Sequence, residues 1–186
     1  MNILVINGGP RENSNSRGVA KYARELFENR VANVNYFDVR NNLLPVYLGD
    51  EEQNQHQEVN KLRRYAQEAD GFFICTPEYH NGMSGALKNA FDFLGKTHFN
   101  GKPVVITATA GGGKGGINAL NNLRLVLRGV FAIVLPQQVV FDLYMFNEEG
   151  ALLHEDGKNQ VSQLVDNLIF VTNLFVSNNR KEMGKC

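Results

Sequence analysis

One stretch of the chain, from Gly8 to Ser16, combines an arginine with several short polar side chains just ahead of a helical pattern. Its polar residues are Arg11, Asn13, Ser14, Asn15 and Ser16. Anions bind at such places, because the first N–H groups of a helix have no partner within it and the helix dipole is positive there. An arginine fork can bind two oxygens of a phosphate. The stretch predicts a phosphate site; a common helix cap with a solvated arginine is the alternative.

A second stretch, from Thr76 to Gly85, has residues suited to hold a planar ligand. It lies between an apolar, strand-like run and a helical pattern. Pro77 restricts the backbone, and Tyr79 can lie against a ring. Asn81 and Gly82 can present backbone donors and acceptors to the edge of a heterocycle. These properties predict that the stretch forms the floor of a site for a ring-shaped ligand.

Glu78 and His80 lie in the same stretch, and each has more than one interpretation. Glu78 is either a surface carboxylate or a group that orders the loop through hydrogen bonds, and we favour the second. For His80 we favour a solvent-facing or hydrogen-bonding role over catalysis, because no nucleophile or carboxylate pair lies near it in the sequence. The remaining histidines are too scattered to indicate a metal site.

A third stretch is composed almost entirely of glycine and contains the pattern G-x-G-x-x-G. It reads Ala110-Gly111-Gly112-Gly113-Lys114-Gly115-Gly116. We reject a dinucleotide-binding loop, because the pattern follows the fourth predicted strand and no acidic residue ends the next strand. A Walker loop fails too, because glycine follows Lys114 where Ser or Thr would hold magnesium. What is left is either a backbone that approaches a ligand closely with exposed N–H groups, or a flexible turn.

The chain alternates strand and helix patterns five times, which is typical of a doubly wound α/β protein. The predicted strands are 3–6, 34–38, 71–75, 103–108 and 131–135, the last stopped by Pro136 and followed by a short extension at 139–141. Polar residues at 34–38 predict an edge strand. Right-handed crossovers favour a flavodoxin-like three-layer sandwich with a five-stranded parallel sheet in the order 2-1-3-4-5. In that order the three polar stretches meet at the carboxyl ends of strands one, three and four.

Local signals also predict where one helix starts and ends and where the chain is irregular. Ser84 is expected to cap the third helix and Gly95 to end it. Residues 40–55 contain Pro45 and Gly49 without a clear period, so they predict a long loop, and loops of that length are often functional.

Composition limits the classes of protein that are possible. The 186 residues are 43% hydrophobic, enough for one core, and we expect a single domain over residues 1–186. Nineteen basic and nineteen acidic residues cancel, which argues against a nucleic-acid or membrane-surface partner. The two cysteines, Cys75 and Cys186, offer neither a disulfide framework nor a zinc cluster, which fits a reducing cytoplasm.

Together, the three stretches resemble the NADPH-dependent FMN reductases. The resemblance rests on Asn7-Gly8-Gly9-Pro10-Arg11-Glu12-Asn13-Ser14, on Thr76-Pro77-Glu78-Tyr79-His80-Asn81-Gly82 and on Ala110-Gly111-Gly112-Gly113. Within that family, residues 84–90 and 112–122 resemble the azobenzene reductase branch. The chain departs from the family where Gly9 and Thr76 replace frequent serines, and the first change removes one hydroxyl that relatives can offer to a phosphate.

The resemblance implies a cofactor, a site and a reaction. FMN would place its phosphate on residues 11–16, its ring on residues 77–82 and its far edge on residues 110–113. The implied cofactor-binding residues are Gly9, Arg11, Ser14, Asn15, Ser16, Pro77, Glu78, Tyr79, His80, Asn81, Gly82, Ala110, Gly111, Gly112 and Gly113. NADPH would pass a hydride to flavin N5, and free flavin, a quinone or an azo compound would then take the electrons in a ping-pong cycle, with no catalytic side chain and no metal required. The resemblance also implies a cytoplasmic homodimer or homotetramer.

Two other functional classes share the expected fold. A flavodoxin-type electron carrier would bind FMN without oxidising NADPH itself, but such carriers are usually strongly acidic and this chain is neutral. A signalling receiver domain would need clustered acids after the first strand to hold magnesium, and Asn7-Gly8-Gly9 stands there instead. The reductase is therefore the preferred interpretation and the carrier is its alternative.

Overall fold

A parallel β-sheet forms the centre of the computed structural model, which describes residues 1–31, 33–111 and 115–183. Its strands are β1 Asn2–Asn7, β2 Asn33–Asp38, β3 Gly71–Tyr79, β5 Pro103–Ala110 and β6 Ile133–Asp142. They lie in the order β2-β1-β3-β5-β6, which confirms the predicted order 2-1-3-4-5 and the edge position of β2. A two-residue strand, β4 Gly82–Met83, pairs antiparallel with the end of β3.

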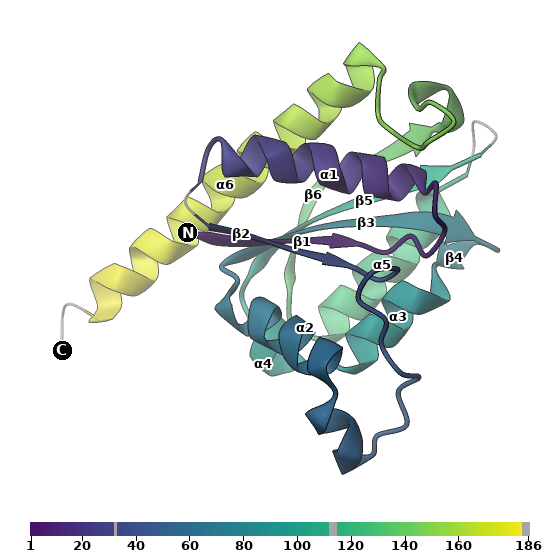
Figure 1. Ribbon diagram of the computed structural model, residues 1–186. Helices are drawn as coiled ribbons and strands as arrows, with labels where there is room; N and C mark the ends of the chain where they lie inside the picture. Colours follow the sequence, from purple (N-terminus) through teal and green to yellow (C-terminus); the bar gives the residue numbers. More distant parts are fainter. Residues whose placement is uncertain (32, 112–114, 184–186) are drawn as a thin grey trace.

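Helices cover both faces of the sheet (Figure 1). On one face lie α1 Asn15–Glu28 and α6 Glu155–Met183. On the other face lie α2 Gln57–Glu68, α3 Gly85–Asp92, α4 Lys96–Phe99 and α5 Ile117–Gly129. Two short 3₁₀ helices complete the chain, η1 Glu51–Gln55 and η2 Leu143–Met145. The arrangement is the predicted three-layer sandwich.

The core has two halves because successive side chains of a strand point to opposite faces of the sheet. Leu4 and Ile6 of β1 contribute to the half beneath α2, α3 and α5. Ile3 and Val5 contribute to the half beneath α1 and α6. Strands buried on both sides in this way read as continuous apolar runs in a sequence, which is why they were predictable.

β3 is longer than predicted, because it continues past Cys75 and through Pro77 to Tyr79. The carbonyl of Cys75 accepts the N–H of Gly8 at 2.7 Å, and β1 ends at that level. Pro77 follows two residues later and so faces the same side, where no strand remains to accept an N–H. The missing donor of proline therefore costs no ladder hydrogen bond, and Pro77 still pairs with Thr109 of β5 on the other side.

β6 also passes through a proline that was predicted to stop it. Val104 of β5 pairs with Val134, but Ile106 pairs with Gln138, so the register shifts between these two positions. Pro136 lies within this bulge on an edge strand, the place where a sheet tolerates proline. The predicted extension at 139–141 is thus part of the same strand, and Phe131 precedes it with a φ of 64°.

The predicted start of α3 is confirmed, and its predicted end is not. Ser84 caps α3 as predicted, since its hydroxyl oxygen accepts the N–H of Leu87 at 3.0 Å. The helix ends at Asp92, and Gly95 instead lies at the N-cap of α4, so the prediction that Gly95 ends the helix was wrong. The chain turns earlier because the N–H of Leu94 bonds to the carbonyl of Phe91 at 2.9 Å. The predicted loop at 40–55 contains η1 at its end.

A two-residue turn, His80–Asn81, joins β3 to β4 where the sequence predicted part of a loop. Both residues have positive φ, 51° and 63°. This is the backbone of a type I′ hairpin turn, whose twist matches that of paired strands. The stretch predicted to hold a ring is therefore a strand end and a hairpin, not the expected loop.

The turn leads to a stability prediction, because left-handed backbone is strained for residues with a branched Cβ. His80 is exposed, so its side chain can be changed without disturbing the core. We expect His80→Val to lower the free energy of unfolding by about 1 kcal/mol, measured by urea denaturation. His80→Gly, which adopts positive φ freely, should be more stable than His80→Val. Equal stability of His80→Val and the wild type would contradict the assignment.

Candidate functional site

A cleft of about 140 Å³ lies at the carboxyl ends of β1, β3 and β5. Its lining residues are Arg11, Asn13, Ser14, Asn15, Pro77, Glu78, Tyr79, Thr109, Ala110, Gly111 and Leu143. Of the predicted site residues, Gly9, Ser16, His80, Asn81 and Gly82 are neighbours in sequence of this lining but not part of it, and Gly112 and Gly113 lie outside the described residues. The sheet thus brings three separate stretches to one cleft.

The backbone of residues 11–16 offers a row of hydrogen-bond donors on the side of this cleft where α1 begins. Apart from that of Ser14, which closes the turn at Glu12–Asn13, the N–H groups of these residues have no acceptor among the residues that the structure describes. Successive unpaired N–H groups at a helix start form a concave site for an anion. Arg11 is exposed beside them, and its guanidinium lies over the ring of Tyr79 at 4.9 Å.

Beneath these donors, two serine hydroxyls and an asparagine form a buried hydrogen-bonded chain. The hydroxyl oxygens of Ser14 and Ser16 are 2.8 Å apart, and Ser16 donates to Oδ1 of Asn7 at 2.8 Å. The same Asn7 oxygen accepts the N–H of Gly9 at 3.0 Å. A Cβ on Gly9 would lie 2.0 Å from the Ser14 hydroxyl, so glycine at this position leaves room for both hydroxyls.

Glu78 connects the hairpin to the start of α5. Its Oε2 accepts the backbone N–H of Ala119 at 2.9 Å, which satisfies one of the free donors of that helix. The amide of Asn118 donates to Oδ1 of Asn81 at 3.1 Å and joins the same two elements again. The interpretation of Glu78 as a group that orders the loop is therefore confirmed.

A buried ion pair that the sequence analysis did not predict lies behind the site predicted to bind a phosphate. Nε of Arg17 lies 2.6 Å from Oδ2 of Asp38, and their side chains are only 11% and 2% exposed. Burial raises the pKa of Asp38, but the hydrogen bonds from Arg17 and from the backbone of Arg40 outweigh it, so this pKa lies below its ordinary value. Thr109 and Leu143 of the lining were missed as well, since neither belongs to a recognisable motif.

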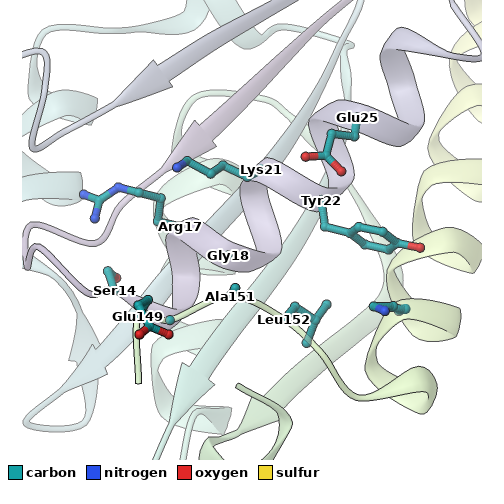
Figure 2. Close-up of a pocket in the computed structure, with 11 residues that line it drawn as sticks. Ser14, Arg17, Gly18, Lys21, Tyr22, Glu25, Glu149, Ala151 and Leu152 are labelled. Carbon is teal, nitrogen blue, oxygen red and sulfur yellow. The ribbon is translucent and has the colours of Figure 1, made fainter. Parts of the chain in front are cut away.

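A larger cavity, of about 400 Å³, lies on the far side of Ser14 between α1 and the segment before α6 (Figure 2). Its walls carry both signs of charge, because Lys21 and Lys158 line it together with Glu25 and Glu149. Nothing in the sequence had indicated it. Its mixed charge selects for no single class of ligand.

Three further observations concern a cysteine, metal ligands and membrane spans among the described residues. Cys75 is fully buried in β3, and burial raises the pKa of its thiol to about 12, so it is not a nucleophile at neutral pH. Among residues 1–31, 33–111 and 115–183 there is no group of three metal-ligating side chains. None of the helices in that part of the chain is long and apolar enough to cross a membrane.

A parallel sheet in the order 2-1-3-5-6, with a ligand cleft at its carboxyl edge, defines a flavodoxin-like α/β protein. Residues 1–145 match the sequence model of the NADPH-dependent FMN reductases, and the chain belongs to this family. The resemblance inferred from the sequence is confirmed.

Individual relatives agree with this assignment. A Bacillus sp. (strain OY1-2) protein named NADPH azoreductase is 46% identical over 169 residues, which cover 90% of each chain. A Staphylococcus aureus (strain USA300) protein named FMN-dependent NADPH-azoreductase is 30% identical over 179 residues, covering 91% of this chain and 95% of the relative. The structure of the flavoenzyme FerB, an NAD(P)H:(acceptor) oxidoreductase from Paracoccus denitrificans, has the same fold, with a TM-score of 0.76, 22% identity, and coverage of 92% and 97%.

The Asp38 ion pair predicts how stability depends on pH. A carboxyl whose pKa is lower in the folded state stabilises that state above its unfolded pKa of about 3.9, and the contribution is lost as pH falls through the folded pKa. We expect Asp38→Asn to be less stable by about 3 kcal/mol at pH 6, because Arg17 loses its counter-charge. Urea unfolding at several pH values should show this difference shrinking below about pH 4.

The matched control is Asp166→Asn. Asp166 pairs with Arg30 at 2.7 Å, but its side chain is 64% exposed. Its removal should change stability by less than about 1 kcal/mol at every pH. A difference for Asp38→Asn that stays constant down to pH 2 would contradict the prediction.

Proposed function

We propose that this chain is an FMN-dependent reductase that takes electrons from NADPH and passes them to a small-molecule acceptor such as a free flavin, a quinone or an azo compound. Membership of the NADPH-dependent FMN reductase family supports the reaction class. The relatives named NADPH azoreductase and FMN-dependent NADPH-azoreductase support NADPH as donor and an azo compound as one acceptor.

The observation that carries the proposal is the row of unpaired N–H groups over residues 11–16, set opposite a strand end that bears Pro77 and Tyr79 in the same cleft. One wall suits a phosphate and the other suits a flat ring. A phosphate of about −1.5 to −2 charges would meet Arg11 and the positive end of α1. The residues present therefore fit FMN.

In this proposal Arg11, Ser14, Asn15 and Ser16 hold the phosphate, and Gly9 leaves room for the two serine hydroxyls. Residues 77–82 hold the ring, and Ala110 and Gly111 approach its far edge, with Gly112 and Gly113 assigned the same role from the resemblance. FMN, when bound, supplies the hydride and electron chemistry. The chain binds and orients it, and Glu78 keeps the hairpin and α5 in register.

The cleft is small beside a whole mononucleotide. Pockets that enclose an organic ligand usually measure about 300–1,000 Å³, whereas this one measures about 140 Å³. A mononucleotide held here would remain partly uncovered. A second reactant can then approach it, first the electron donor and then the acceptor.

The alternative, an electron carrier of the flavodoxin type, is less well supported. Carriers rely on a charged surface to dock with redox partners, and the formal net charge here is zero. A carrier would hold FMN in the same cleft, so only the reaction with NADPH separates the two functions.

We also propose that residues 1–186 act as one FMN-binding domain in a cytoplasmic homodimer or homotetramer. An exposed apolar segment supports self-association, since Leu43, Val46 and Leu48 are 70%, 74% and 70% exposed. Exposed apolar residues clustered in this way often mark protein interfaces. Native mass spectrometry of the purified protein would give the number of subunits.

The first prediction for this function concerns the purified protein. It should be yellow, or should bind added FMN, and under anaerobic conditions NADPH should bleach the flavin absorbance within the time of mixing. Addition of an azo dye should restore the absorbance. A protein that binds FMN but is not bleached by NADPH would be a carrier, and a protein that binds no flavin would refute both functions.

The second prediction concerns the phosphate contact. Arg11→Ala should fold normally, because Arg11 is exposed, and should bind FMN about tenfold or more weakly, the usual effect of losing a charge-assisted hydrogen bond. Fluorescence titration with FMN measures this change. Arg128→Ala removes another exposed arginine, in the last turn of α5, and it should bind FMN as the wild type does. Equal affinity of Arg11→Ala and wild type would remove the assignment.

A further inference from the structure

We infer that Arg17 and Arg40 are positioning residues that build the anion site by holding the carbonyl groups of residues 9–12 away from it. The inference rests on the proposed binding of FMN and goes beyond it, because neither arginine lines the cleft. We call residues 8–14 the phosphate loop.

Arg17 uses its whole guanidinium on the inner side of this loop. Arginine carries five N–H donors in a planar fork. Nε and Nη2 of Arg17 donate to the carboxylate of Asp38 at 2.6 and 3.2 Å, and Nη2 also donates to the carbonyl of Gly9 at 3.3 Å. Nη1 donates to the carbonyl of Arg11 at 2.8 Å and to that of Glu12. In Figure 2 the guanidinium points away from Tyr22 and Glu25 on the same helix.

Arg40 binds the one carbonyl in this series that Arg17 does not reach. Its Nη1 donates to the carbonyl of Pro10 at 3.1 Å, and its Nη2 lies 3.6 Å from the carboxylate of Glu12. The backbone N–H of Arg40 in turn donates to Asp38 at 2.9 Å. Both arginines are thus anchored on the same buried carboxylate at the end of β2.

The direction of the N–H groups follows from peptide geometry. In a trans peptide the C=O of one residue and the N–H of the next point in opposite directions. The carbonyls of Pro10, Arg11 and Glu12 point toward the two arginines, so the N–H groups of Arg11, Glu12 and Asn13 point away from them. These are donors without an acceptor among the described residues. The arginines therefore determine which side of the loop an anion meets.

The charges around the site support the same positioning role for Arg17. Asp38 is a buried carboxylate behind a site proposed for a phosphate, and alone it would repel that ligand. Arg17 neutralises it at 2.6 Å, and Arg11 is left exposed at the cleft to meet the phosphate. Arg17 acts through the loop and not by touching the ligand.

The test compares FMN with riboflavin, which has the same ring but no phosphate. The full-length apoprotein is titrated with each flavin, and the quenching of flavin fluorescence gives both dissociation constants. Their ratio, riboflavin over FMN, measures what the phosphate contributes. In the wild type we expect FMN to bind more tightly.

The variants are Arg17→Lys and Arg40→Met. Lysine keeps the charge but has three donors and no fork, so it cannot hold three carbonyls and Asp38 together. Arg17→Lys should lower the ratio about tenfold or more, while riboflavin affinity changes less than about threefold. Arg40→Met, which releases one carbonyl, should lower the ratio less. It also decides the question if Arg17→Lys does not fold, because Arg40 is 43% exposed. Arg128→Met, at an exposed position in the last turn of α5, is the control and should leave the ratio unchanged.

Three other outcomes of the titrations would overturn either the inference or the proposed function. An unchanged ratio in folded Arg17→Lys and Arg40→Met would overturn the inference, and so would an equal loss of affinity for FMN and riboflavin, which would indicate general structural support. A wild-type ratio near one would instead overturn the phosphate assignment in the proposed function, and the inference with it. The wild type and the variants therefore test the two proposals separately.

Discussion

The buried ion pair between Arg17 and Asp38 is the interaction on which the geometry of the site depends. It joins the first turn of α1 to the carboxyl end of β2, and through Arg17 it reaches the carbonyls of the loop between β1 and α1. Charges are expensive to bury unless they are paired and hydrogen-bonded. Here every donor of the guanidinium has an acceptor, so the pair is tolerated in the interior. The conformation of the loop is the result.

The opposite wall of the cleft is built by different means. A strand end continues past the last residue of β1, turns tightly at His80–Asn81, and is held against α5 by Glu78 and Asn118. The side proposed for an anion is thus organised by arginines bound to carbonyls, and the side proposed for a ring by a hairpin bound to a helix start. Both are tied to the ends of buried strands, which holds the two walls at a common spacing.

The position of the cleft at the carboxyl edge of the sheet is consistent with membership of the NADPH-dependent FMN reductases. In such enzymes the cofactor carries the reaction and the protein supplies binding, orientation and access. That division explains why the informative residues are those that shape the backbone, such as Arg17, Pro77 and Glu78.

Local patterns were enough to predict the strands, the cap at Ser84 and the three stretches that form the cleft, because apolar periodicity and capping are properties of neighbouring residues. The strand order followed from the right-handed crossovers of such a pattern. The passage of β3 and β6 through Pro77 and Pro136 emerged only in the folded molecule, since it depends on where the adjacent strand ends or shifts register. The same holds for the link between Arg17 and Asp38, which are 21 residues apart, and for Leu143 at the cleft. No local pattern signals such pairs, because their partners meet only when the sheet has formed.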